Sequence, residues 1–504
     1  MSSTDVLIAG AGPTGTALAI DLARRGVSVR IVDKAPHSSQ GSRAKGIQPR
    51  TLEVLEDLGV LDPVLRGGAE YPLAGFHLGP LTIPWRMFRK AMPSSSVPYP
   101  NTWLIPQGRT DAALHARLLE LGVRIEYGSE VLAVAQHADR VVVHVANPLG
   151  TEEISARYLA GADGGGSRVR STAGIDFVGT THEQDRILIV DAEVSGLARN
   201  RWHMWPGRGG RFIAACPLPH GELFQWMVRL APDEEPPVDL PAISARIQAQ
   251  IRRPRVVLRC LHWRSVFRPN IRLAARYRDK RVLIVGDAAH VHTPAGAQGL
   301  NTGIQDAYNL GWKLAQVLAG ADDALLDSYE LERRPIAAGV LGLSTRKYEA
   351  IGKLAPSSAR RGKAEQQLTL SYFGAVLAPT SSEGTSTLRV GDRAPDARLT
   401  AASGAPVRLF ELLCGPQFTG IAFGESAHAA LRELRWPTRG ATLQRLEIST
   451  GAAGLRDAGN SFASAYGVTT AALLLIRPDG YIAHIARQKL SSSAAALGQF
   501  TPGP

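Results

Sequence analysis

A glycine-rich turn close to the N-terminus carries the clearest chemical signal in the chain. It follows the apolar run 6–9, which predicts a buried strand, and its residues are Gly10, Ala11, Gly12, Pro13, Thr14 and Gly15. Two glycines let the backbone turn tightly and approach a pyrophosphate, and the third lets the next helix pack closely on the strand. Asp33, with Lys34 beside it, ends the second predicted strand, where a carboxylate can accept hydrogen bonds from ribose hydroxyls. The pattern predicts a dinucleotide site that suits FAD or NAD better than NADP.

Two later motifs also follow predicted strands. Asp163-Gly164 comes after the apolar run 158–162, with arginines nearby that could meet phosphates; alone, it is as readily a surface turn. In the segment 281–301 a strand ends in Gly286-Asp287, and proline and glycine residues then lead into a long predicted helix over 300–318. This segment predicts a backbone-lined cradle with a helix N-terminus pointing into it, suited to a ring system that becomes anionic on reduction.

Taken together, the three motifs resemble the single-component FAD-dependent aromatic hydroxylases of the para-hydroxybenzoate hydroxylase fold. The resemblance covers about residues 5–350, where the motifs occur in the family's order and spacing. Residues 42–47 and 49–53 are similar to the branch that includes polyketide and phenolic-acid hydroxylases. Residues 390–396 and 474–481 resemble the thioredoxin-like tail domain of larger members, but this tail has no CxxC pair, so we expect a structural or interface role for it.

The resemblance implies roles at the adenosine and diphosphate end of FAD. Asp33 would bind the adenosine ribose, and Val131 would touch the adenine with its backbone. Arg43 would lie beside the diphosphate, and Gln107 would contact the ribityl region. These roles follow from the family's pattern and not from the spacing of the residues alone.

The resemblance also implies roles at the flavin end. Asp163 is implicated in binding both FAD and the reduced nicotinamide, and Asp287 in holding the ribityl chain and pyrophosphate. The residues expected around the isoalloxazine are Pro294, Gly296, Gly299, Leu300 and Asn301. Only one glycine fingerprint is present, so NADPH or NADH is expected to bind transiently at the flavin domain rather than in a second dinucleotide domain.

The reaction that the resemblance implies is a monooxygenation with FAD, NAD(P)H and O2. A C4a-hydroperoxyflavin would pass one oxygen atom to a phenolic or polycyclic, polyketide-type aromatic substrate. The same chemistry on a carbonyl would give Baeyer–Villiger insertion or ring cleavage, and the motifs do not separate the two outcomes. A remote alternative from another class is a non-catalytic flavin-binding or nucleic-acid-binding module.

Charge and composition weigh against nucleic acid as the partner. The chain has 57 basic and 45 acidic residues, a formal net charge of +12, but the basic residues are scattered in pairs and form no long run. We therefore expect a protein that takes anionic cofactors and a small aromatic substrate. The three cysteines exclude a disulfide framework and a cysteine-rich metal site, and no metal is expected.

The substrate wall is expected on aromatic strands between about 185 and 265. The candidates are Trp202, Trp205, Phe212, Phe224, Trp226 and Trp263, with Pro294 near the flavin and Tyr71, Trp85 and Trp103 on the other side. Alternating aromatics on a strand are more often core than pocket. His290 and His292 could assist deprotonation of a phenol, but packing against the neighbouring loop is the simpler role, so no catalytic residue is assigned.

These elements must be positioned by an α/β architecture. A Rossmann-like FAD-binding domain is predicted from three stretches, 1–75, 103–184 and 270–350, interrupted by an antiparallel substrate sheet from 76–102 and 185–269. A linker over 351–388 leads to the thioredoxin-like domain, 389–504. No leader and no apolar run of transmembrane length occur, so a cytoplasmic monomer or homodimer is expected.

Overall fold

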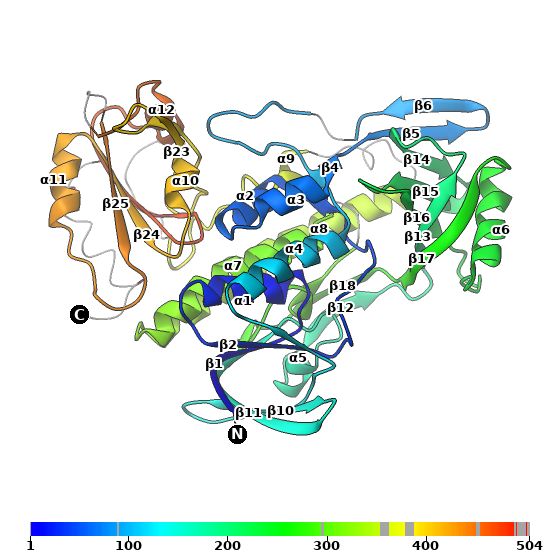
Figure 1. Cartoon of the computed structure of the whole chain (residues 1–504), viewed down its shortest axis with the longest axis horizontal. Coiled ribbons are helices and arrows are strands. Elements are labelled where there is room, and N and C mark those ends of the chain that lie inside the picture. Colours follow the sequence, from blue (N-terminus) through cyan, green and yellow to red (C-terminus); the bar gives the residue numbers. More distant parts are fainter. Residues whose placement is uncertain are drawn as a thin grey trace.

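The computed structural model describes residues 2–87, 90–293, 297–352, 362–378, 388–449, 454–487, 490 and 500. The region predicted to bind FAD lies at the centre, the inserted, mostly antiparallel sheet on one side of it, and the C-terminal domain on the other (Figure 1). In the described residues no helix has both the length and the apolar character needed to cross a membrane.

A parallel sheet positions the motifs. Its strands, in spatial order, are β19 (Arg278–Asp279), β20 (Val282–Ile284), β11 (Gly150–Gly161), β1 (Ser2–Ala9), β2 (Val29–Asp33) and β8 (Ile125–Tyr127); β10 (Val141–Asn147) pairs with β11, and β9 (Glu130–Gln136) pairs with β10. β1 runs parallel to β2 and β11, and β11 runs parallel to β20. Because the carboxyl ends of parallel strands meet at one edge, all three predicted motifs lie along that edge.

Helices cover this sheet and connect it to the rest of the molecule. They are α1 (Pro13–Ala23), α2 (Pro49–Asp57), α3 (Leu61–Gly67), α4 (Gln107–Glu120), α5 (Arg168–Thr172), α7 (Gly299–Leu318) and α8 (Asp327–Gly352). α1 begins at Pro13, whose fixed φ suits the first helical position, and residues 15–22 of it are buried. α1 packs against α7 and α4, which brings the two helix N-termini of the motifs together.

The insertion forms a second sheet, and its faces have different environments. Its order is β17 (Val257–Phe267), β13 (Ile187–Ser195), β16 (Leu223–Arg229), β15 (Phe212–Pro217), β14 (Arg201–Pro206), β5 (Leu73–Leu78) and β6 (Leu81–Trp85). α6 (Leu240–Ile251) packs on one face over a core that includes Ile243 and Ile247. Two small sheets complete this region: β12 (Phe177–Thr181), β18 (Asn270–Ala274) and β21 (His290–Val291), and β3 (Gly46–Ile47), β7 (Trp103–Leu104) and β4 (Ala69–Glu70).

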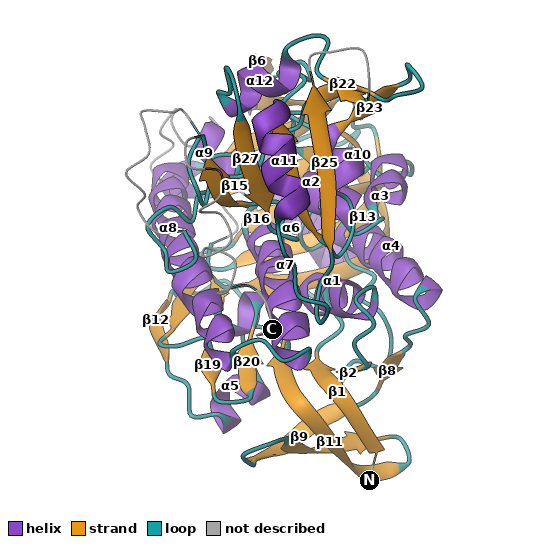
Figure 2. Cartoon of the chain, turned by 90° about the vertical axis from the view of Figure 1, so that its left-hand side faces the viewer, coloured by secondary structure: helices purple, strands orange, loops and turns teal. Residues whose placement is uncertain are grey.

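The C-terminal domain is a mixed sheet flanked by helices. Its strands are β23 (Pro406–Arg408), β22 (Arg398–Thr400), β26 (Leu455–Arg456), β25 (Leu443–Ser449), β24 (Phe418–Phe423), β27 (Ala472–Ile476) and β28 (Ile482–Ala486). Its helices are α10 (Leu409–Leu413), α11 (Glu425–Glu433) and α12 (Ser461–Tyr466), of which α11 packs on β24, β25 and β27 (Figure 2). Cys414 is free, and burial raises its pKa to about 12, as suits a structural thiol.

The segment predicted as a linker is not an exposed spacer where the structure describes it. Residues 362–378 include α9 (Lys363–Gln366), and the side chains of Glu365, Gln367, Tyr372 and Leu377 are buried. Gln367 donates to Thr302 Oγ1 at 3.2 Å and accepts from Gln305, so this segment packs directly on α7. Composition predicted a linker because the segment is rich in Ser, Ala, Arg and Gly, whereas its buried polar groups find partners in the helix.

Buried ion pairs fix the C-terminal domain against the FAD-binding region. Arg477 binds both oxygens of Glu332 on α8, at 2.6 and 2.9 Å, and also Asp479 at 2.5 Å. Lys313 on α7 donates to the same Glu332 carboxylate at 2.8 Å. All four side chains are at most 1% exposed. Such charges are stable in a protein interior only when every one of them is paired, so the two parts must stay docked.

We predict that Arg477→Met destabilises the protein strongly. The variant leaves Glu332 and Asp479 as buried carboxylates without their main cation, which costs about 3–5 kcal/mol. The measurement is the midpoint of urea unfolding. Arg432→Met is the matched control, because Arg432 pairs with Glu447 at the surface and its loss should leave the midpoint unchanged. Equal midpoints for the two variants would contradict the assigned role of the buried network.

Candidate functional site

A single cavity of about 1460 Å³ runs between the edge of the parallel sheet and the inserted sheet. One end is lined by the glycine turn, by Asp33 and Lys34, and by the backbone around Val131. The other end is lined by side chains of the inserted sheet. The motifs and the predicted substrate region therefore meet in one continuous cavity.

Each glycine of the first turn is required, or leaves space, for a different structural reason. Gly10 has φ 101°, and a Cβ there would lie 2.4 Å from the carbonyl oxygen of Ala162 at the end of β11. A Cβ at Gly15 would lie 1.9 Å from the Gly10 oxygen, so only glycine lets α1 start so close to the turn. Gly12 has no protein atom within 4 Å of such a Cβ, which leaves space for a ligand. Gly12 also caps α1 with no side-chain hydrogen bond, so the helix N–H groups are available to an anion.

Asp33 ties the turn to β2. Its Oδ2 accepts from the N–H of Ala11 at 2.7 Å and its Oδ1 from that of Ala35 at 2.8 Å. The carboxylate thus has a fixed orientation at the cavity wall, with lone pairs left for ribose hydroxyls. Arg43 and Gln107 line the same cavity, and Gln107 Oε1 accepts from the N–H of Ala44 at 3.4 Å.

The two later aspartates have different surroundings. Asp163 accepts from Ser167 Oγ at 2.5 Å and from the N–H groups of Arg168 and Val169, so it caps the start of α5. Asp287 is exposed at the cavity wall, where its carboxylate can accept hydrogen bonds from a ligand. Both aspartates were predicted to bind a ligand, and both line the cavity. Asp163 in addition accepts hydrogen bonds that stabilise the start of α5.

The cradle before α7 lies partly outside the described residues. Pro294 and Gly296 are not described, whereas Gly299 and Leu300 line the cavity at the first turn of α7. No side-chain hydrogen bond caps this helix at Gln298, so its N–H groups offer the positive end of a helix dipole. Asn301 is buried behind the cavity wall, where it binds Gln48 and Gly46.

The inserted sheet presents a partly different set of aromatics from the one expected. Trp205, Phe224 and Trp226 lie in the core against α6 and do not line the cavity; the prediction for them was wrong by one step of the strand alternation. Of the six aromatics predicted on strands, Trp202, Phe212 and Trp263 line the cavity. Other cavity-facing side chains of these strands include Ile187, Ile189, Met204, Ala214, Gln225 and Met227. Tyr71 and Trp85 also line it, whereas Trp103 donates to the Val64 carbonyl oxygen.

The two histidines beside the cradle differ. His290 is fully buried, with Nε2 lying 2.6 Å from Asp306, which also accepts from Arg333 at 2.6 Å, so His290 has a structural role. His292 lines the cavity, and its Nδ1 lies 2.8 Å from the Thr293 carbonyl oxygen. Burial lowers the pKa of His292, which favours the neutral imidazole.

Sequence reasoning missed a polar group at the floor of the cavity. Lys45 Nζ donates to Gln225 Oε1, and Gln225 Nε2 donates to Ser42 Oγ at 2.5 Å. Ser42 in turn donates from N and Oγ to Asp191, at 2.7 and 2.5 Å. The signal available was a glutamine and an aspartate inside the apolar strands β16 and β13, but the strand phase must be known to place them, and nothing in the sequence joins them to Lys45, which precedes β3.

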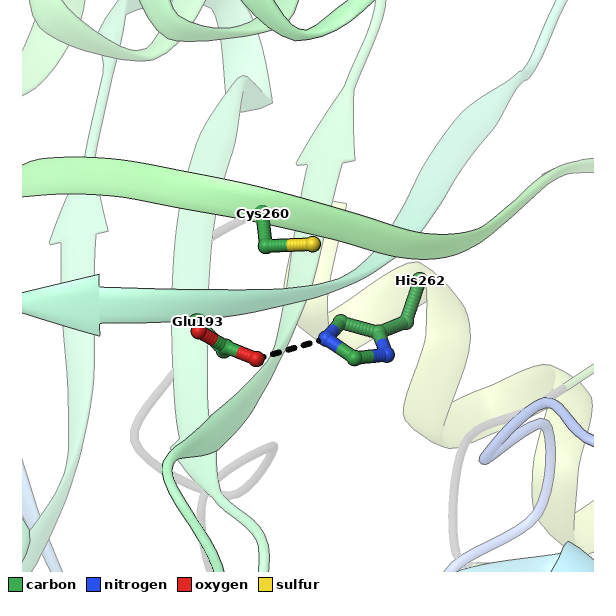
Figure 3. A group of neighbouring side chains, drawn as sticks. All are labelled: Glu193, Cys260 and His262. Carbon is green, nitrogen blue, oxygen red and sulfur yellow. Dashed lines mark hydrogen bonds and ion pairs between the residues drawn. The ribbon is translucent and has the colours of Figure 1, made fainter.

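One group of possible metal ligands lies on the inserted sheet beyond the residues that line the cavity. Glu193, Cys260 and His262 have ligand atoms within 4.8 Å of one another, and Glu193 lies 2.8 Å from His262 Nε2 (Figure 3). Cys260 and His262 are exposed, and the carboxylate already has the imidazole as its partner. We assign this group no part in the cavity's chemistry.

The cavity fits FAD in its chemistry. The open face at Gly12, the two uncapped helix N-termini and the fixed carboxylate of Asp33 are the groups that a pyrophosphate and a ribose need. The residues that would hold FAD are therefore those of the glycine turn, with Asp33, Arg43, Gln107 and Asp287.

Comparison with known proteins identifies the family. Residues 3–344 match the FAD binding domain family, and residues 387–501 match the C-terminal domain of aromatic-ring hydroxylases. The chain belongs to this FAD-binding family and is a flavin-dependent aromatic monooxygenase. The non-catalytic alternative is thereby set aside.

Individual relatives support the same assignment. The chain is 41% identical over 486 residues to a flavin-dependent monooxygenase of Mycobacteroides abscessus, covering 95% of this chain and 96% of that protein. It is 38% identical over 356 residues to the 12-dehydrotetracycline 5-monooxygenase/anhydrotetracycline 6-monooxygenase of Streptomyces rimosus subsp. rimosus, covering 67% and 68% of the two chains. A solved ternary complex of aklavinone-11 hydroxylase with FAD and aklavinone has a TM-score of 0.84, with 26% identity over 99% of each chain. The predicted fold class and FAD cofactor are confirmed.

We predict that Asp287→Ala weakens FAD binding by about 10- to 100-fold, because a hydrogen-bonding carboxylate at the cavity wall is lost. The measurement is the dissociation constant of FAD from quenching of its fluorescence on titration of the apoprotein. Asp139→Ala, at a surface position, is the control and should bind FAD as the parent does. A folded Asp287→Ala protein with parental affinity would show that Asp287 is not part of the cofactor site.

Proposed function

We propose that this enzyme inserts one oxygen atom of O2 into the ring of a polycyclic phenol of polyketide type, with NADH or NADPH as the electron donor. The observation that carries the proposal is the continuity of the cavity from the glycine turn to the inserted sheet. A cofactor held at the turn and a substrate held on the sheet would share that cavity. Once bound and reduced, FAD supplies the activation of O2 and the electrophilic oxygen.

The substrate end of the cavity has the surface that a fused aromatic ring needs. Trp202, Met204, Phe212 and Met227 offer flat or polarizable apolar area from adjacent strands. An apolar wall of this kind excludes water from the reacting ring, which protects the activated oxygen from unproductive loss. The names of the relatives, which include anhydrotetracycline and aklavinone, support a polycyclic substrate.

The test is turnover with a panel of polycyclic phenols. We expect at least one of them to accelerate NADH or NADPH oxidation about tenfold or more and to give a product heavier by one oxygen atom, labelled when 18O2 is used. Nuclear magnetic resonance of the product distinguishes ring hydroxylation from insertion beside a carbonyl. Nicotinamide oxidation that never responds to a phenol, or a labelled lactone as product, would overturn the proposal.

A variant on the sheet tests where the substrate lies. Met204→Trp fills part of the cavity from β14, so we expect it to raise the KM for the phenol at least tenfold while FAD content is unchanged. Leu149→Trp is the control, because Leu149 is 99% exposed in the turn between β10 and β11. Parental kinetics of Met204→Trp would place the substrate elsewhere.

A further inference from the structure

Lys45 is the buried cation of the cavity. Its side chain is 9% exposed, and Nζ lies 4.7 Å from the centre of the Trp202 ring and 3.9 Å from Met227 Sδ. The other cations that line the cavity are exposed: Lys34, Arg43, Arg168 and Arg268. Taking an ammonium out of water is costly, so a lysine at this position calls for an anionic or hydrogen-bond-accepting partner.

The protein supplies only part of that partner. Among the described residues no carboxylate lies within ion-pair distance of Nζ, and its hydrogen-bond acceptors are neutral: the amide oxygen of Gln225 and, at 3.9 Å, the sulfur of Met227. That amide is held in place because its Nε2 donates to Ser42 Oγ and to the Arg43 carbonyl oxygen at 3.1 Å. The side-chain amide of Gln225 is therefore oriented with its oxygen toward Lys45 and its nitrogen toward Ser42 and Arg43.

Two titratable groups face Lys45 from neighbouring strands, and neither forms an ion pair with it. Asp191 on β13 has each oxygen hydrogen-bonded to Ser42, and burial raises its pKa. Cys216 on β15 is buried, and burial raises its pKa to about 11, so it is an uncharged thiol at neutral pH. Burial lowers the pKa of Lys45 itself, against the opposing effects of Cys216 and Asp191, so an anionic oxygen beside Nζ would stabilise the charged form.

We propose that Lys45 forms the oxyanion subsite for the substrate: its Nζ donates a hydrogen bond to the phenolic oxygen, and its positive charge stabilises the phenolate. The O–H bond of the phenol breaks and the proton passes to solvent water, so the step needs no other reactant. Ionisation raises the electron density of the ring ortho and para to the oxygen, where an electrophilic oxygen would add. The assignment rests on the proposed function, because it presumes a phenolic substrate on the inserted sheet.

Trp202 and Gln225 explain why the subsite selects an aromatic oxyanion. The Trp202 ring lies against the ammonium and lines the cavity, so a flat ring stacked beside it would bring its oxygen to Nζ. Gln225 and the weakly accepting sulfur of Met227 each accept one hydrogen from Nζ, which leaves the third N–H group of the ammonium for the substrate. His292, which also lines the cavity, lies beside Gly299.

The experiment measures ionisation of a bound dye without turnover. Alizarin, a dihydroxyanthraquinone whose phenolate absorbs at longer wavelength than its phenol, is added to oxidised, FAD-loaded enzyme, and spectra are recorded across pH. We expect bound alizarin to ionise at least one pH unit lower than free alizarin. Lys45→Met should abolish this shift with FAD content unchanged, and Lys45→Arg, which keeps the cation, should restore much of it. Lys363→Met, on the exposed side of α9, is the control and should behave as the parent.

Every outcome bears on the assignment. An unchanged shift in Lys45→Met, or a parent enzyme that binds no alizarin or binds it without a shift, overturns the subsite. Failure of the proposed function is separate: a shift that depends on Lys45, in an enzyme that oxygenates no phenol, would leave the oxyanion subsite intact and refute the reaction.

Discussion

The rest of the structure depends on the close approach of the Gly10 turn to the end of β11. No side chain fits between Gly10 and the Ala162 carbonyl, or between Gly15 and the turn itself. This contact lets α1 begin directly beside the strand ends, and α7 packs on α1, so two uncapped helix N-termini lie at one cavity. A cofactor that carries negative charge is bound by backbone groups whose position the fold fixes, rather than by side chains that must be ordered on binding.

The C-terminal domain supports the same site from behind. Arg393 pairs with Glu53 of α2, and Arg50 of that helix donates to the Asp479 carbonyl oxygen at 2.8 Å. Gln48 precedes α2, and its N–H donates to the side chain of Asn301 on α7. Asn301 in turn donates to the carbonyl oxygen of Gly46, the residue that follows Lys45. The docked domain thus braces a continuous set of contacts that ends at the cavity floor, which accounts for a thioredoxin-like tail without a redox pair.

Sequence reasoning succeeded where the chemistry is local. The glycine turn, Asp33 and the segment around Asp287 are contiguous motifs, and each was found because backbone geometry restricts the residues it tolerates. On the inserted sheet it was correct for Trp202, Phe212 and Trp263 and wrong for Trp205, Phe224 and Trp226. The period of a strand can be read from the sequence but its phase cannot, and only packing on α6 decides which residue faces the cavity. Lys45 and the Arg477–Glu332 ion pair were missed because Gln225 and Glu332, their respective partners, are more than a hundred residues away in the chain.

The central claim is that cofactor and substrate share one cavity, and the flavin spectrum tests it directly. Oxidised, FAD-loaded enzyme is titrated anaerobically with a polycyclic phenol that does not absorb at the wavelengths of the visible flavin bands, while those bands are recorded. A saturable change in band shape with one-to-one stoichiometry is the result that the account predicts, because the ligand would alter the surroundings of the isoalloxazine. Binding detected by calorimetry with an unchanged flavin spectrum would contradict it.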